Sequence, residues 1–325
     1  MRLLLCALIP LPLIANDHNS PPIEASITAH YDQSDGQLNP VWNFFGYDEG
    51  NYTFDEEGKK LLAEIAAIQP EPAFVRSHHL LTSGSGETWL KWSSTNAYSE
   101  NSDGNPVYDW TIVDQIFDTY MELGLKPLVQ IGFMPEALSS EPEPYTPKKN
   151  LHEEPKGMVT GGAFHPPADY GKWQRFIQAW ATHCRDRYGR EEASSWYWEL
   201  WNEPNGGYWK GTPEEYFRLY DYTAAAIKKV LPTAPFGGPH ITNPDYREGG
   251  RFLDAFLDHC ANEQNAVTGR TGAPLDFIAF HAKGGTSWEQ DHVRMDLGNH
   301  LLQINKSLAI IASYPEFRNL PLIVG

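Results

Sequence analysis

The strongest chemical signal in the sequence is a carboxylate, Glu203, which lies between Asn202 and Pro204 directly after an aromatic run at residues 196–201. A carboxyl group between Trp201 and Pro204 is expected to lie in a partly desolvated cleft, and desolvation raises a carboxyl pKa toward the range that a general acid needs. Asn202 beside it offers a hydrogen-bond donor and an acceptor for a hydroxyl group. The alternative is a glutamate that only caps the following turn. The aromatic context favours Glu203 as a general acid/base.

Other polar residues share one position in the sequence, because each comes at or directly after the end of a short β-rich run. The carboxyl ends of parallel strands meet at one face of an α/β barrel, so these side chains are expected to converge with Glu203 on one pocket. Taken alone, each histidine is more often a structural residue, and the shared position is what favours a role in the pocket. The residues at these strand ends are Arg76, Ser77, His78, His79, Gln130, His240 and His281.

These residues are positioned by an alternation of β-rich runs and helical stretches, which predicts parallel strands joined by crossover helices. A closed barrel needs eight strands. An open doubly wound sheet does not, but it would more often show a glycine-rich phosphate loop after its first strand, which this sequence lacks. We therefore predict an α/β fold, a (β/α)8 TIM barrel with about seven of its eight strands in this chain. The predicted strands are 41–45, 73–76, 126–131, 196–200, 235–238, 276–280 and 320–324; the predicted helices are 55–68, 110–123, 170–188, 212–230, 251–260 and 289–312.

The composition limits the class of ligand. A net charge of −17 disfavours nucleic acid as a partner, because phosphate binding needs a basic face. Aromatic residues make up 13% of the chain, which suits either a large core or a pocket that stacks sugar rings. Trp209, Phe133 and Trp288 are candidate platforms for such rings. The sequence has no HExxH motif and no other convincing ligand set, so we expect no metal and no cofactor.

The N-terminal residues resemble a segment that is removed from the mature protein rather than a part of the fold. Residues 1–15 form an apolar run with one cation, Arg2, which is too short to span a bilayer and resembles a secretory signal peptide. We therefore expect a secreted or periplasmic protein with no membrane span. Residues 16–39 are polar and are expected to form an extended segment leading into a single catalytic barrel at 40–325.

The sequence resembles glycoside hydrolase family 39, a family of β-xylosidases and α-L-iduronidases among the retaining glycosidases built on (β/α)8 barrels. The Asn-Glu-Pro triplet alone marks only that wider clan. Four stretches together point to the family and extend from about residue 40 to the C-terminus. They are residues 198–205 (WELWNEPN) with Tyr208 and Trp209, residues 124–135 (GLKPLVQIGFMP), residues 76–78 (RSH) and residues 276–284 (DFIAFHAKG).

The resemblance implies roles for five residues. Glu203 corresponds to the family's acid/base, and Asn202 to the residue that contacts the sugar 2-hydroxyl. Arg76 corresponds to the arginine that lies near the nucleophile and keeps it ionised, as a nearby cation lowers a carboxyl pKa. His78 and His281 correspond to histidines of the substrate pocket.

The family's nucleophile is a glutamate at the end of the seventh strand. Here that strand ends at Gly325, so the nucleophile is expected just beyond Gly325 and the chain resembles a barrel that is incomplete at its C-terminus. A retaining enzyme needs two carboxyl groups about 5–5.5 Å apart. Glu199 is not expected to substitute, because it lies four residues before Glu203 and deeper in the barrel.

The sugar is the least determined part of the prediction. Lys283 corresponds to a lysine that lies near the sugar carboxylate in iduronidase-like members, whereas many xylosidases of the family carry tyrosine there, and some bacterial ones carry lysine. A pocket ammonium favours a uronic acid, but the acidic net charge weighs against a sulfated polysaccharide. We expect β-xylosidase-like hydrolysis of a small oligosaccharide or glycoside. An α-L-iduronidase-like or other uronic-acid glycosidase is the alternative, and a non-catalytic carbohydrate-binding barrel is the alternative of another class.

Overall fold

The protein was analysed as a computed structural model that describes residues 26, 28, 30–33, 36, 40–69, 71–86, 93–142 and 162–325. The chain divides into two units, Met1–Asn39 and Pro40–Gly325, and the second contains all the elements described below. The signal peptide predicted at 1–15 and most of the segment predicted at 16–39 lie outside the described residues. So do residues 143–161 of the long loop expected between the third predicted strand and the next helix.

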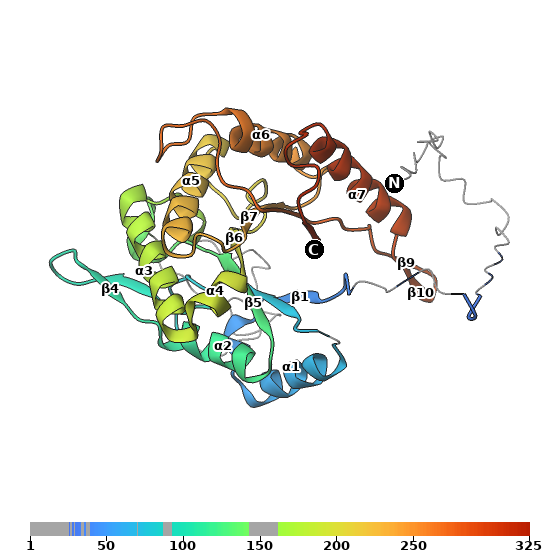
Figure 1. Cartoon of the computed structure of the whole chain (residues 1–325), viewed down its shortest axis with the longest axis horizontal. Coiled ribbons are helices and arrows are strands. Elements are labelled where there is room, and N and C mark those ends of the chain that lie inside the picture. The colour runs from blue at the N-terminus through green and yellow to red at the C-terminus, as the bar shows by residue number, and fades with distance from the viewer. Residues whose placement is uncertain are drawn as a thin grey trace. The chain divides into compact units, whose positions relative to one another are not determined.

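A parallel sheet of seven strands forms the centre of the second unit, and the strands follow one another in chain order. The sheet curls, and β1 and β11 are its two edges (Figure 1). The prediction of a (β/α) barrel is confirmed, and the described residues contain seven of its strands. The strands are β1 (Phe44–Tyr47), β2 (Phe74–Ser77), β5 (Lys126–Ile131), β6 (Tyr197–Leu200), β7 (Phe236–Ile241), β8 (Phe277–Phe280) and β11 (Leu322–Val324).

Aromatic contacts across the sheet show which side chains point to the inside of the curl. Phe44 on β1 and Tyr197 on β6 have ring centroids 5.6 Å apart, although two other strands separate β1 from β6. Phe74 also contacts Tyr197, at 5.0 Å, and Tyr197 contacts Phe277 on β8 at 5.1 Å. Strands so far apart in the sheet can meet only across its concave face, so these rings form an apolar layer inside the barrel, which Ile323 joins.

The helices lie around the outside of the sheet (Figure 1). Thr212 caps α5 with a full capping box, with Pro213 at the first helical position, as the sequence predicts. No helix among the described residues is long and apolar enough to cross a membrane. The helices are α1 (Glu56–Ile68), α2 (Thr111–Glu122), α3 (Tyr170–Tyr188), α4 (Arg190–Ser195), α5 (Pro213–Val230), α6 (Gly249–Asn262) and α7 (Leu297–Ala312), with 3-10 turns η1 (Gly50–Tyr52), η2 (Glu136–Leu138) and η3 (Gly162–Phe164).

Two of the element predictions need correction. The helix expected from residue 289 begins only at Leu297, because residues before it form a hairpin of β9 (Ser287–Glu289) and β10 (His292–Arg294). The loop expected at 77–109 contains a second hairpin of β3 (Tyr98–Glu100) and β4 (Pro106–Tyr108). In both places a short antiparallel pair of strands provides hydrogen-bond partners for backbone N–H and C=O groups. The periodicity of the sequence does not indicate this pairing.

The fifth predicted strand, at 235–238, is also longer in the structure. β7 continues to Ile241 and its register shifts between Pro239 and Ile241, so that His240 lies at an irregularity of the strand. Such bulges change the direction of a side chain at the end of a strand.

A buried histidine on α6 ties the outer helices together. Nε2 of His259 lies 2.9 Å from Oδ1 of Asp221 on α5, and its Nδ1 lies 3.0 Å from Oε2 of Glu263. The Asp221 carboxylate also accepts from Asn265 Nδ2 and the backbone N–H of Ala266. Although burial opposes it, the two carboxylates raise the pKa of His259 above its ordinary value.

We expect His259→Gln to destabilise the protein more at pH 5.5 than at pH 9. A histidine whose pKa is raised by folding contributes stability that is fully present below its unfolded pKa and is lost as pH rises through the folded value. A hydrogen bond to a charged group contributes about 1.5–3 kcal/mol, and the difference should be of that order. Denaturant unfolding of the wild type and variant at both pH values measures it. A destabilisation that does not change with pH would contradict a charged His259.

Candidate active site

Strand alternation places a polar layer above the apolar layer of the barrel. Side chains two residues apart on a strand point to the same face. Arg76 follows Phe74 by two residues, Glu199 follows Tyr197, and Gly325 follows Ile323. The carboxyl ends of the strands therefore present charged and polar groups above a closed apolar floor, which is the position of catalytic residues in barrels of this type.

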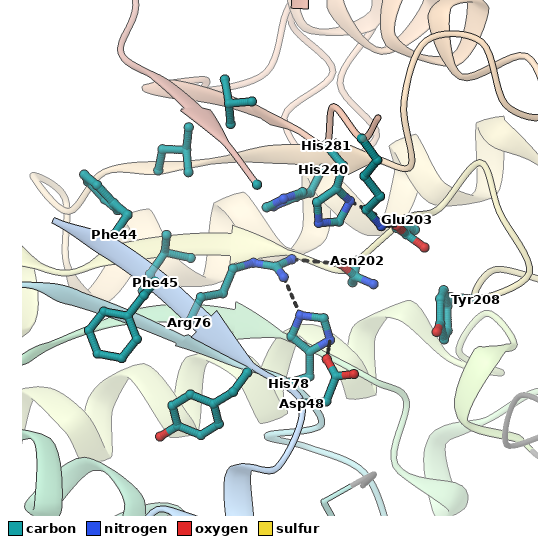
Figure 2. Close-up of a pocket in the computed structure, with 17 residues that line it drawn as sticks. Phe44, Phe45, Asp48, Arg76, His78, Asn202, Glu203, Tyr208, His240 and His281 are labelled. Atoms are coloured by element: carbon teal, nitrogen blue, oxygen red, sulfur yellow. Dashed lines mark hydrogen bonds and ion pairs between the residues drawn. The ribbon is translucent and has the colours of Figure 1, made fainter. Parts of the chain in front are cut away.

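A cavity of about 340 Å³ opens at this end of the barrel. Six of the seven residues predicted for the site line it. Figure 2 shows Arg76 and His78 on one side of the pocket and His281 and Glu203 on the other. The predicted lining residues are Arg76, His78, Asn202, Glu203, His281 and Lys283; the others are Phe44, Phe45, Gly46, Tyr47, Asp48, Leu128, Tyr208, His240, Ile323, Val324 and Gly325.

Glu203 lies three residues beyond the end of β6 in a left-handed backbone conformation with φ 49°. Lys283 Nζ and His281 Nδ1 both lie 3.0 Å from its Oε1. Burial opposes ionisation, but His281 and Lys283 outweigh it and lower the pKa of Glu203 to about 2. The expectation that burial would raise this pKa is therefore wrong for this structure, because a histidine and a cation contact the carboxylate directly.

A second carboxylate, Glu199, lies fully buried beneath the cavity and bridges two strands. Its Oε2 accepts from Arg76 Nε at 2.5 Å, and its Oε1 lies 2.6 Å from Nδ1 of His240. Arg76 also donates from Nη2 to Oδ1 of Asn202 at 3.1 Å. The partner of Arg76 in this structure is thus Glu199, deeper in the barrel, and the arginine links that carboxylate to Asn202. With its oxygen bonded to Arg76, Asn202 can offer its amide nitrogen to a ligand.

Both ring nitrogens of His78 are bonded within the protein. Arg76 Nη1 contacts its Nε2, and because a guanidinium only donates, that nitrogen is the acceptor. Nδ1 therefore carries the proton and lies 3.3 Å from Oδ1 of Asp48 (Figure 2). Burial and Arg76 hold the pKa of His78 well below its ordinary value, so the ring is neutral. His78 thus acts as a bridge that fixes Asp48 at the wall of the cavity.

The predicted aromatic platforms lie elsewhere. Trp209 is buried and packs edge-on against Trp201, and it lines a separate cavity. Phe133 is also buried and stacks on Tyr208, with ring centroids 5.5 Å apart. Tyr208, rather than Phe133, lines the cavity together with Glu203. Trp288 is 76% exposed on β9.

Sequence reasoning missed Asp48 and Tyr208. Asp48 directly follows β1, and the strand-end rule would have identified it had the strand been predicted to end at Tyr47 rather than at residue 45. Tyr208 lies in the loop after Glu203, where no periodicity indicates which of two neighbouring aromatic residues faces the cavity.

The arrangement suits binding of a neutral polar ligand and acid–base chemistry on it. Burial lowers the pKa of His240 and His281 as it does that of His78, so all three imidazoles are neutral near pH 7. Neutral imidazoles, an amide and carboxylates form hydrogen bonds with hydroxyl groups. No group of three or more His, Cys, Asp or Glu side chains in the described part of the chain could hold a metal ion.

Comparison with known proteins identifies relatives of most of the barrel. The family "Glycosyl hydrolases family 39" matches residues 71–324. A β-xylosidase from Geobacillus stearothermophilus is 31% identical over 280 residues, which cover 81% of this chain and 48% of the relative. Mouse α-L-iduronidase is 25% identical over 249 residues, which cover 74% of this chain and 34% of the relative.

A solved structure supports the same assignment. The monomeric β-xylosidase from Caulobacter crescentus superimposes with a TM-score of 0.65 at 26% identity, covering 86% of this chain and 50% of that one. The chain therefore spans about half the length of the β-xylosidases that it matches.

We expect Lys283→Met to raise the pKa of Glu203 by roughly one unit, because removing a nearby opposite charge leaves the effect of burial less opposed. Carbon-13 NMR titration of the glutamate carboxyl groups measures this shift. Lys306→Met is a matched control, since Lys306 pairs with the exposed Asp245 and is not among the residues lining the cavity. An unchanged pKa of Glu203 in the Lys283 variant would show that the ion pair does not hold the carboxylate.

Proposed function

The chain belongs to glycosyl hydrolase family 39, and on that premise we propose that the full-length protein is a retaining β-xylosidase-like glycoside hydrolase. The observation that carries the proposal is the placement of Glu203. This carboxylate follows a central barrel strand and lines a cavity together with Asn202 and neutral histidines. A cavity of about 340 Å³ lies at the small end of the range for ligand pockets, which suits one or two sugar rings.

In the proposed reaction Glu203 acts twice. It first protonates the oxygen of the leaving group, and later it removes a proton from the water that releases the sugar. The ionised state held by Lys283 and His281 suits the second step. The first step requires a proton on Glu203, so bound substrate must weaken the contact with Lys283, whose side chain is 58% exposed.

The second carboxyl group of a retaining mechanism must stand on the other side of the sugar. We propose that the end of β11 positions it, because Gly325 lines the same cavity as Glu203. Gly325 still bonds to β8 through Phe280 O at 3.0 Å, so the backbone there is held in the sheet.

A β-xyloside is the substrate that we favour, since the relatives at 31–32% identity are named β-xylosidases. A uronic-acid glycoside is the second candidate, and the position of Lys283 in the cavity favours it. The charge of Lys283 is opposed by Glu203, to which its ammonium group donates a hydrogen bond. A sugar carboxylate would therefore have to compete with Glu203 for this ammonium group.

We expect Glu203→Gln to lower kcat/KM on phenyl β-xyloside by about 10²- to 10⁴-fold, the contribution typical of a general acid. The loss should be much smaller on 2,4-dinitrophenyl β-xyloside, whose leaving group needs no proton. Glu214→Gln, an exposed glutamate near the start of α5 that is not among the residues lining this cavity, is the control and should keep wild-type activity.

The same assays separate the alternatives. Faster hydrolysis of phenyl uronides than of xylosides would favour the uronidase alternative, and sugar binding without any turnover would favour a non-catalytic barrel. Wild-type turnover of the phenyl substrate by the Glu203 variant would refute the acid/base assignment. A first sugar product of inverted anomeric configuration, followed by proton NMR, would refute the retaining mechanism.

A further inference from the structure

His240 has a backbone conformation that the sequence does not favour. Its φ is 53°, in the left-handed region that disfavours residues with a Cβ atom. It lies at the register shift near the end of β7, and its side chain is 1% exposed. Non-glycine residues persist in this conformation only where their surroundings fix it, and such positions are concentrated at functional sites.

The backbone of His240 holds the backbone of Glu203. The carbonyl oxygen of His240 accepts a hydrogen bond from the N–H of Glu203 at 2.9 Å. Glu203 is itself left-handed and lies beyond the end of β6, where the regular ladder no longer fixes it. The direction of the His240 carbonyl therefore helps to determine the position of the Glu203 backbone, and with it the direction of the Glu203 side chain.

The imidazole of His240 is fixed from below. Its Nδ1 bonds to Glu199 Oε1 at 2.6 Å, and Glu199 is in turn bonded to Arg76. Arg76 bonds to Asn202, so one buried carboxylate is connected both to Asn202 and, through His240, to Glu203.

The same ring is also covered on its cavity side. The His281 ring packs on it with centroids 4.1 Å apart. A Cβ atom at Gly325 would lie 2.8 Å from its Nε2, so this glycine packs directly against the ring. With Glu199 below and these two residues beside it, the ring has little room to rotate, and the backbone that carries it is fixed as well.

We propose that His240 is a positioning residue for Glu203: its imidazole, bonded to Glu199, fixes the left-handed backbone whose carbonyl holds the N–H of Glu203. The inference rests on the proposed function, since it assigns His240 to the proton transfer that Glu203 performs. His240 acts through Glu203 and does not itself exchange a proton with the substrate.

The proposal has a kinetic signature that loss of folded protein does not produce. A misplaced acid slows substrates with poor leaving groups, which need its proton, more than substrates with good ones. We define the leaving-group ratio as kcat/KM on 2,4-dinitrophenyl β-xyloside divided by kcat/KM on phenyl β-xyloside. A merely destabilised enzyme loses activity on both substrates equally, and its ratio is unchanged.

The experiment compares this ratio in the wild type and in His240→Ala, using the full-length protein. We expect the ratio to rise by about tenfold or more, since small misplacements of a catalytic group cost up to about 10²-fold in rate. In His240→Gly the ratio should return at least halfway to the wild-type value on a logarithmic scale, because glycine adopts the left-handed backbone without strain. If the imidazole only filled space, the ratio would rise further in His240→Gly than in His240→Ala, since glycine leaves the larger cavity.

A matched control comes from the other buried histidine that is bonded to a carboxylate. His259→Ala removes the contact with Asp221, neither of which lines the cavity, and should leave the ratio unchanged. His240→Phe keeps the bulk of the ring but cannot bond to Glu199. It should raise the ratio as His240→Ala does, and it carries the test if the alanine variant does not fold.

Three outcomes decide the matter. An unchanged ratio in the folded His240 variants overturns the inference, as does a glycine variant with a ratio equal to or above that of the alanine variant. Glu203→Gln is measured in parallel. If it does not raise the ratio, the proposed function itself fails; if it does and the His240 variants do not, only the positioning role fails.

Discussion

The buried carboxylate of Glu199 is the constraint on which the pocket depends. It has no access to water and is bonded on one side to Arg76 and on the other to His240. Removing one partner of a buried ion pair costs about 3–5 kcal/mol, because the remaining charge is left uncompensated. Both partners offset the cost of burying this charge, and they also hold Asn202 and the backbone of Glu203. The geometry of the pocket is thus a consequence of satisfying a charge beneath it.

The fold was predictable wherever a long periodic pattern had clear ends. The helix at Tyr170–Tyr188 agrees to the residue, because Asp169 caps its start and Gly189 follows its end. The two hairpins were missed, although the loop at 101–105 carries a turn signal, Asp103-Gly104, between two short β-rich runs. Their strands have only three residues each, and in so short a segment local pairing rather than periodicity decides the structure.

The site was predictable in its members but not in its electrostatics. The strand-end rule and the resemblance brought together six residues that do line one cavity, because parallel strands in a barrel direct their carboxyl ends to one face. Trp209 was predicted to contact the ligand but lines a separate cavity. The direction of a loop side chain depends on local backbone angles, which periodicity does not report. The pKa of Glu203 could not be deduced from its own neighbours in the sequence, because His281 and Lys283, which lower it, come from a distant part of the chain.

The alternation of side chains along the strands also determines which changes the barrel can absorb. Phe74, Arg76 and His78 alternate with outward residues, as do Tyr197 and Glu199 on β6. A slip of one residue in any strand would turn its inward set outward and bring apolar helix-facing side chains into the cavity. Insertions in the connecting loops leave this register intact. The loops at the rim of the pocket can therefore change in length while the chemistry at its base stays tied to the spacing of residues within each strand.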